Sequence, residues 1–391
     1  MRLVVLAGAF ALITPLLAAQ TITTARQNQS APDRMQVLPL HIGGRVQIQP
    51  MTPVIPPDAP RAAYRHQWPG VYFEAAFEGD AVVLKFDDPV NEYRLIIDDM
   101  PPIPLAQPGK AEVTIADLSG GPHRLRLEKV TESIWMLGRF EGFYVAPDAR
   151  MLPVSPRPRQ IEFIGDSDMT GYGLRSDTRT CTQEQVRLRS DTQAAYPALV
   201  ARHFDADYQI NAISGRGIVR NYDGMAPDHT MAAVYENILP DESANPAPYA
   251  DTEWQPQIII IGLGNNDFAS PLQPAEPWAT HDALIDSYIA GMEAFVTTLQ
   301  GSNPAATLMI YWPDTGILTK PEKARLDREG QSRLTQTAQQ LGLKPLQFFT
   351  MEGLDLDALG CDFHASASDN RKKAKWLINR MASNPALWVA D

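Results

Sequence analysis

Two blocks of the sequence carry the side chains of nucleophilic acyl transfer. Ser167 stands two residues after the apolar run 161–164, in Gly165-Asp166-Ser167. A serine hydroxyl becomes a nucleophile when a base takes its proton. His364, near the C-terminus, offers that base, and Asp362 offers a carboxylate that could hold the imidazole in the required tautomer.

Two further blocks offer hydrogen-bond donors. Ser214-Gly215 follows the apolar run 208–212, and Asn266 follows the run 258–261. Glycine lets a backbone N–H approach a ligand closely, and an amide side chain adds an NH₂ group. Such donors stabilise the negative charge that builds on a carbonyl oxygen during acyl transfer. Each block alone is more often a turn or a helix cap, but four of them after predicted strands indicate a site.

The elements that must position these blocks alternate between strand and helix. Short apolar runs at 161–164, 208–212, 258–261 and 307–311, with a weaker one at 346–349, predict strands. Helical patterns lie near 192–203, 283–299, 321–341 and 368–382. The alternation predicts an α/β fold, a parallel sheet covered on both faces. Ligands bind beyond the carboxyl ends of such strands, which is where the four blocks lie.

The N-terminal half has a different rhythm. Short alternating segments at 45–49, 71–77, 81–86, 93–97, 111–115 and 123–128 are separated by turn formers, with no convincing helix between them. This predicts a β-sandwich; loops decorating a larger domain would be less regularly spaced. We therefore expect a sandwich over 38–150, a proline-rich linker over 151–160 and the α/β domain over 161–391.

Composition excludes several classes of protein. A chain of 391 residues suggests two domains, and 33 prolines predict much irregular chain. Its 46 acidic and 34 basic side chains give a net charge of −12, which disfavours nucleic acid as a partner. Two cysteines are too few for a disulfide scaffold or a thiolate zinc site. The histidines outside the His364 block show no metal-ligand spacing, so we expect no metal site.

The first residues indicate export. Residues 1–19 combine an early arginine, an apolar stretch and small residues before a polar segment, as a cleaved signal peptide does. An uncleaved membrane anchor is the alternative, but the apolar stretch is short for a span. We expect a secreted or periplasmic protein without a membrane span, with a disordered leader over 20–37.

Together the four blocks resemble those of the SGNH (GDSL-type) hydrolases. Longer stretches, including 214–222, 264–268 and 360–364, resemble carbohydrate esterase family 2 more specifically. The resemblance implies a jelly-roll-like sandwich joined to a three-layer α/β/α domain. It also implies an enzyme that removes acetyl groups from plant cell-wall polysaccharide such as xylan or glucomannan, without metal or organic cofactor.

The resemblance also implies roles for single residues. Ser167 becomes the nucleophile and His364 the general base, while the backbone N–H groups of Ser167 and Gly215 and the side chain of Asn266 form the oxyanion hole. Members of the family look like either Ser-His-Asp triads or Ser-His dyads. We expect Asp362 to orient the base, since the residue three before the histidine is a cysteine here.

Three more expectations concern side chains near the site. Asp168, beside the nucleophile, would alter the rate by raising the basicity of the histidine or repelling an anionic leaving group. Cys181 and Cys361 both fall in loops at the active edge, and in an oxidising compartment we expect them to form a disulfide; two unrelated buried thiols are the alternative. Phe363 adjoins the histidine and is our candidate for packing against a sugar ring.

Two other functions remain open on the sequence. One is a general esterase or lipase of the same superfamily that acts on small esters. The other is a carbohydrate-binding protein without catalysis, which would have no need of a serine and a matched base. Conversion of Ser167 to alanine separates the catalytic classes from the binding one.

Overall fold

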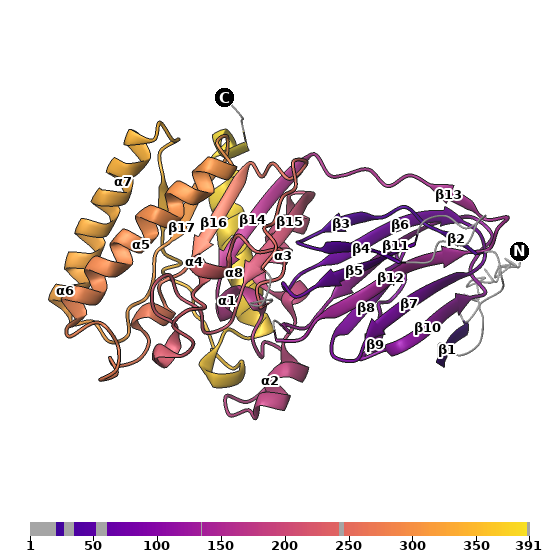
Figure 1. Ribbon diagram of the computed structural model, residues 1–391, viewed down its shortest axis with the longest axis horizontal. Helices are drawn as coiled ribbons and strands as arrows, with labels where there is room; N and C mark the ends of the chain where they lie inside the picture. The colour runs from indigo at the N-terminus through magenta and orange to yellow at the C-terminus, as the bar shows by residue number, and fades with distance from the viewer. Residues whose placement is uncertain (1–20, 27–34, 52–60, 134, 242–245, 389–391) are drawn as a thin grey trace, which may run out of the picture.

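The computed structural model describes residues 21–26, 35–51, 61–133, 135–241 and 246–388. Over these residues the chain forms two antiparallel sheets, followed by a five-stranded parallel sheet with helices. The two parts lie side by side along the longest axis of the molecule (Figure 1). The expected order, a sandwich followed by an α/β domain, is confirmed. None of the helices in the described ranges combines the length and hydrophobicity that crossing a bilayer requires.

The sandwich packs one face of each antiparallel sheet against the other. The first sheet contains β1 (Thr21–Arg26), β2 (Gln36–Val37), β4 (Gln47–Met51), β5 (Arg61–His66), β7 (Val82–Asp88), β10 (Gly109–Ala116) and β12 (Gly138–Val145). The second contains β3 (His41–Gly43), β6 (Tyr72–Glu78), β8 (Glu92–Ile97), β9 (Ile103–Ala106), β11 (Pro122–Lys129) and β13 (Arg150–Leu152). Alternate residues of each sheet, such as Leu84, Phe86, Leu125 and Leu127, point inward and form a closed apolar core.

Two boundaries differ from the expected ones. The expected leader over 20–37 is not wholly disordered, because Thr21–Arg26 forms strand β1 on the edge of the first sheet, paired antiparallel with β10. Its Thr and Ile residues favour extended backbone, which outweighs its polar character. The linker is also shorter than expected: β13 pairs with β6 up to Leu152, and the next strand begins at Arg159. The predicted signal peptide, 1–19, lies outside the described residues.

The parallel sheet has the order β15-β14-β16-β17-β18. Its strands are β14 (Arg159–Gly165), β15 (Ala206–Ala212), β16 (Ile258–Gly262), β17 (Thr307–Tyr311) and β18 (Gln347–Phe349). The helices are α1 (Ser167–Thr170), α2 (Gln183–Arg189), α3 (Tyr196–His203), α4 (Met231–Val234), α5 (His281–Ser302), α6 (Lys320–Arg325), α7 (Gln331–Gln340) and α8 (Ala367–Ala382), and a π-helical turn, Leu326–Gly330, joins α6 to α7. All five predicted strands are present, and α5 and α8 match their predicted segments closely.

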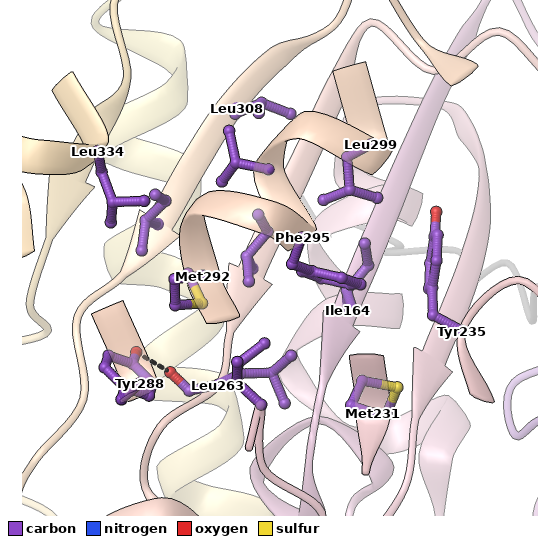
Figure 2. Packing of buried hydrophobic residues seen from close by; sticks show 14 of the residues in the cluster. Ile164, Met231, Tyr235, Leu263, Tyr288, Met292, Phe295, Leu299, Leu308 and Leu334 are labelled. Carbon is purple, nitrogen blue, oxygen red and sulfur yellow. Dashed lines mark hydrogen bonds between the residues drawn. The ribbon is translucent and has the colours of Figure 1, made fainter. Parts of the chain in front are cut away.

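Both faces of this sheet are apolar, as a strand covered by helices on both sides requires. Along β16, Ile259 and Ile261 belong to the core beneath α5 and α7, while Ile258 and Ile260 belong to the core beneath α3 and α8. Figure 2 shows the first of these cores, where the Tyr288 hydroxyl donates to the backbone oxygen of Leu263 over 3.0 Å. The run of four isoleucines is therefore explained by burial on both faces.

The sandwich covers the edge of the parallel sheet. Every residue of β15, the edge strand, is buried. Side chains of the sandwich reach three successive residues of this strand: Tyr72 Oη donates to Asp207 over 2.7 Å, Arg126 to Tyr208 over 2.8 Å, and Arg45 to Gln209 over 3.2 Å. An uncovered edge strand would offer unpaired backbone groups to other chains, and here the sandwich domain protects it.

Candidate active site

The predicted nucleophile lies on a sharp turn between a strand and a helix. Strand β14 ends at Gly165, and the carboxylate of Asp166 caps α1 by accepting a hydrogen bond from the backbone N–H of Asp168 over 3.0 Å. Ser167 is the first residue of this helix. The helix ends after one turn at Gly171, whose φ of +73° suits glycine. The turn thus presents the serine hydroxyl at the carboxyl edge of the sheet.

Ser167 and His364 form a hydrogen-bonded pair. Their Oγ and Nε2 atoms lie 2.8 Å apart, although 197 positions separate them in the chain. The other ring nitrogen, Nδ1, lies 2.9 Å from the backbone carbonyl oxygen of Cys361. A carbonyl oxygen only accepts, so the ring proton belongs on Nδ1, and the Nε2 lone pair is free to take the serine proton. The geometry is that of a nucleophile with its general base.

Asp362 does not orient the base. Its carboxylate accepts a hydrogen bond from the hydroxyl of Tyr172 over 2.9 Å, while the carbonyl of Cys361 occupies Nδ1 of His364. The tight turn at Cys361–Phe363, with φ of +52° at Asp362, brings the carbonyl of its first residue onto the imidazole. The expectation of a Ser-His-Asp triad through Asp362 is therefore wrong.

Tyr172 holds the face of the imidazole, and the sequence analysis gave it no role. Its ring centroid lies 4.3 Å from that of His364, with the planes tilted by 33°. Burial, together with the hydrogen bond to Asp362, raises the pKa of the Tyr172 phenol, so it stays protonated and donates. Asp362 therefore acts on the base only through this ring.

Cys181 and Cys361 form a disulfide, with their Cα atoms 5.5 Å apart. The predicted pairing is confirmed. The bond ties the loop after the nucleophile to the residue whose carbonyl holds His364. Gly173 makes this close approach feasible, because a Cβ at that position would lie 2.4 Å from the Cβ of Cys361. Arg179 adds a second link by donating to the backbone oxygens of Asp357 and Ala358 over 2.7 and 2.9 Å.

The side chain of Asn266 links the turn that carries Ser167 to the loop that carries Gly215. Among the described residues, no hydrogen bond occupies the backbone N–H of Ser167 or of Gly215, whose φ is +79°. Asn266 Nδ2 lies 3.0 Å from Asp166 Oδ2 and 2.9 Å from the backbone oxygen of Arg216. The amide of Asn266 thus contacts Asp166, which precedes Ser167, and Arg216, which follows Gly215. Both N–H groups of this amide already have acceptors.

Asp166 is buried behind this group of donors. Burial, and then the nearby charge of Asp168, raise the pKa of Asp166 to about 7. A carboxyl group with a pKa of about 7 is about half ionised at pH 7, so it places less negative charge beside the N-terminus of α1 than an ordinary aspartate would.

The loop after β15 is fixed by a buried carboxylate. Asp267 accepts hydrogen bonds from three successive backbone N–H groups, those of Ile218, Val219 and Arg220, over 3.0, 2.9 and 3.0 Å. Burial raises the pKa of Asp267 to about 6 despite these donors. The arrangement holds the loop that carries Gly215 against the loop that carries Asn266.

Asp168 is paired away from the nucleophile. Its carboxylate bonds to the ammonium group of Lys373, a buried residue on α8. We expected Asp168 to alter the rate as a carboxylate beside the serine, but in the structure its charge is paired with Lys373. Lys373 had no sequence signal of its own, because it stands on an ordinary helical face 206 positions after Ser167.

One cluster outside this site has the composition of a metal centre. Ligand atoms of His41, Glu74 and Asp207 lie within 4.8 Å of one another. However, Glu74 is bonded to Arg126 and Arg157, and Asp207 to Arg157 and Tyr72. Although burial opposes it, hydrogen bonds from His41 and Tyr72 lower the pKa of Asp207. The guanidinium groups already balance these carboxylates, so the cluster is an ion-pair network joining the two domains.

Substitution of Asp362 by asparagine should leave catalysis nearly intact. An asparagine oxygen can still accept from Tyr172, and His364 keeps the carbonyl of Cys361. We expect kcat for an aryl acetate to change by less than about threefold, whereas loss of a true orienting carboxylate costs about 10⁴-fold. Steady-state kinetics of the purified variant measure this, and a loss of a thousandfold or more would restore Asp362 as the orienting acid.

Removal of the disulfide should lower both stability and kcat. In the variant with Cys181→Ala and Cys361→Ala, the loop holding His364 loses its covalent link, and we expect about 2–4 kcal/mol less unfolding free energy. Urea unfolding and kcat below the unfolding transition test this. Wild-type protein treated with a phosphine reductant should behave in the same way. Unchanged kcat in both samples would show that the disulfide does not hold His364 in place.

Comparisons with known proteins agree with this geometry. Residues 58–155 match the family described as carbohydrate esterase 2 N-terminal, and residues 161–376 match the GDSL-like lipase/acylhydrolase family. An acetylxylan esterase/glucomannan deacetylase of Cellvibrio japonicus is 40% identical over 363 residues, covering 92% of this chain and 94% of the relative.

Solved structures extend the similarity. A carbohydrate esterase whose active site is said to display divergent catalytic and non-catalytic binding functions is 39% identical, with a TM-score of 0.79 over 90% of this chain and all of that one. A family two carbohydrate esterase from Clostridium thermocellum, in complex with cellohexaose, shares the fold at 21% identity, with a TM-score of 0.70 over 89% of this chain and all of that one. The chain belongs to the GDSL-type hydrolases, among the carbohydrate esterases that carry the family 2 N-terminal domain.

Proposed function

We propose that this protein is a secreted or periplasmic serine esterase that removes O-acetyl groups from a plant cell-wall polysaccharide such as xylan or glucomannan. The observation that carries the proposal is the 2.8 Å contact between Ser167 Oγ and His364 Nε2, which pairs a nucleophile with its general base. The 40% identity to an acetylxylan esterase/glucomannan deacetylase supports the substrate class. The signal-like first residues and the disulfide support export.

In the acylation step, Ser167 Oγ attacks the carbonyl carbon of the acetyl ester as its proton passes to His364 Nε2. The negative charge that forms on the carbonyl oxygen is stabilised by the backbone N–H groups of Ser167 and Gly215. Asn266 supports these donors through its bonds to the residues beside them, and its amide adds a third N–H if it turns from one acceptor. The C–O bond to the sugar then breaks, and Nε2 returns the proton to the leaving hydroxyl.

In the deacylation step, water replaces the sugar. His364 takes a proton from the water as it attacks the acetyl group on Ser167, and acetate leaves with the serine hydroxyl restored. The carbonyl of Cys361 accepts the Nδ1 proton throughout both steps. This carbonyl fixes the tautomer of His364, and its dipole stabilises the imidazolium that forms. In this mechanism the carbonyl therefore does the work of the carboxylate in a Ser-His-Asp triad.

The rim of the site is aromatic, which suits a neutral sugar polymer. Phe363, Trp135 and Tyr222 are 70%, 63% and 47% exposed, although such large rings are usually buried. Guanidinium groups back two of these rings: Arg179 lies 5.1 Å from the ring of Phe363, and Arg216 lies 5.2 Å from that of Trp135. Trp135 comes from the sandwich, so a bound polymer would contact both domains.

Conversion of Ser167 to alanine tests the mechanism. Removal of the nucleophile should lower acetate release from acetylated xylan, acetylated glucomannan and an aryl acetate by at least about 10³-fold, while polysaccharide binding persists. Acetate release that continues unchanged would sink the serine mechanism. If the wild-type protein hydrolyses only the aryl acetate, it is a general esterase; if it binds polysaccharide and hydrolyses none of the three, it is a binding protein.

Conversion of Phe363 to alanine tests the sugar contact. Loss of an exposed ring that packs on a pyranose should raise KM for acetylated polysaccharide about three- to tenfold, from the ~0.5–1.5 kcal/mol of an aromatic contact. KM for a small aryl acetate should not change. Met151→Ala is a matched control, because Met151 is 45% exposed on β13 of the sandwich. Equal effects of Phe363→Ala on both substrates would contradict a sugar-binding role.

A further inference from the structure

A loop of the sandwich reaches the hydrolase domain beside the site. Residues 130–133 directly follow β11, and a buried polar network fixes them. The hydroxyls of Thr131 and Ser133 both donate to the side-chain oxygen of Asn91, the first over 2.9 Å. The amide nitrogen of Asn91 donates in turn to Asp88 over 2.7 Å. The residue between the two hydroxyls, Glu132, is therefore held from both sides.

The hydrolase domain grips the start of the same loop. The backbone N–H of Thr192 donates to the oxygen of Val130 over 3.0 Å, and the side chain of Gln193 donates to the oxygen of Lys129 over 3.3 Å. These contacts prevent the loop from shifting relative to the parallel sheet. The position of Glu132 relative to the hydrolase domain is thus set by contacts from both domains.

The carboxylate of Glu132 meets the loop that carries an oxyanion donor. Its two oxygens accept from Ser214, one from the backbone N–H over 2.7 Å and one from the hydroxyl. Ser214 directly precedes Gly215, whose backbone N–H is an oxyanion donor in the proposed mechanism. A shift of Ser214 would rotate the peptide that carries this N–H. Glu132 therefore fixes the residue on which the orientation of one donor depends.

The same contact reaches the nucleophile turn. The hydroxyl of Thr170, a fully buried residue of α1, lies 3.1 Å from Ser214 Oγ and 3.3 Å from the backbone oxygen of Ser167. The same hydroxyl also hydrogen-bonds to the carboxyl group of Glu132. Glu132, Ser214 and Thr170 thus form a continuous polar path from the sandwich to the helix whose first N–H is the other oxyanion donor.

Cationic side chains near Glu132 offset part of the energetic cost of burying its carboxyl group. Lys129 and Arg216 both interact electrostatically with Glu132, and Lys129 Nζ donates to the backbone oxygens of Gln67 and Trp68 over 2.7 and 3.2 Å. Burial lowers the pKa of Lys129 to about 7, so this lysine is about half charged at pH 7 and Arg216 supplies the more constant charge. Burial raises the pKa of Glu132, and hydrogen bonds from Ser214 oppose this. Both carboxylate oxygens serve as acceptors from Ser214, which is the role of the ionised form.

We propose that Glu132 is a positioning residue for the oxyanion hole, by which the sandwich domain sets the spacing between the N–H of Gly215 and the N–H of Ser167. The role rests on the serine mechanism proposed above but not on the identity of the sugar. It concerns the transition state of any acyl ester, because Glu132 contacts the donors through Ser214. The sandwich then contributes to catalysis directly, besides any contribution to substrate binding.

Glu132→Ala should lower kcat for an aryl acetate about 10- to 100-fold with KM unchanged, because removal of a whole oxyanion donor costs about 10²- to 10³-fold. The inhibition constant of a small alkyl boronic acid, whose tetrahedral adduct on Ser167 puts an oxygen in the hole, should rise by the same factor. Glu132→Gln keeps an oxygen for the Ser214 N–H and an NH₂ group for its hydroxyl, so it should restore kcat to within about threefold of wild type.

Tyr72→Phe is the matched control. It removes two other hydrogen bonds between the domains, the 2.7 Å bond to Asp207 and the 3.4 Å bond from the backbone N–H of Tyr208, near the amino-terminal end of β15 and away from the site. We expect it to lower the melting temperature while kcat and boronate inhibition stay at wild-type values. If Tyr72→Phe reduces kcat as much as Glu132→Ala does, general loosening of the interface explains the effect and the positioning role is wrong.

Ser214→Ala keeps the proposal testable if Glu132→Ala fails to fold. It lies outside the sandwich and removes only the hydroxyl link to Glu132 and Thr170. It should lower kcat and weaken boronate inhibition by the same factor, with KM unchanged. Wild-type kcat in Ser214→Ala and in folded Glu132→Ala would overturn the proposal, whereas wild-type activity in Ser167→Ala would overturn the serine mechanism itself.

Discussion

An imidazole can take a proton from serine through one nitrogen only while its other nitrogen keeps a proton, and the site of this protein is arranged around that requirement. The carbonyl of Cys361 accepts the Nδ1 proton of His364 at 2.9 Å. Because this acceptor is a backbone carbonyl, its position depends on the conformation of the backbone itself. The disulfide to Cys181, the glycine at position 173 and the packing of Tyr172 on the imidazole all serve this one hydrogen bond.

The proposed mechanism also requires that two backbone N–H groups, each following a separate strand, point to one oxygen. The N–H of Ser167 comes from the turn after β14 and that of Gly215 from the loop after β15. Neighbouring parallel strands bring these turns together, but they do not fix the orientation of each peptide. Buried carboxyl groups do so instead: Asp267 binds the loop after Gly215, and Asp166 binds the amide of Asn266. Sheet geometry and buried polar contacts are therefore both needed.

The fold and the reacting pair could be predicted because their signals are local. Doubly buried strands such as 258–261 are continuous apolar runs, and Ser167 and His364 stand in short sequence blocks that follow predicted strands. The acceptor for Nδ1 could not be predicted, since it depends on a φ of +52° at Asp362 that turns the Cys361 carbonyl inward. Glu132 and Lys373 also gave no signal, because each meets the site only through long-range packing. Strand β1 was missed because pairing with β10 outweighs a polar composition.

The covered edge of β15 has a consequence for how such a protein could be re-engineered. Sandwich side chains bind Asp207, Tyr208 and Gln209 of this buried strand, so removal of the sandwich would expose polar groups that now have partners inside the protein. The hydrolase part cut out alone would therefore need new partners for these side chains. Grafting it onto a foreign binding domain would require a redesigned edge strand.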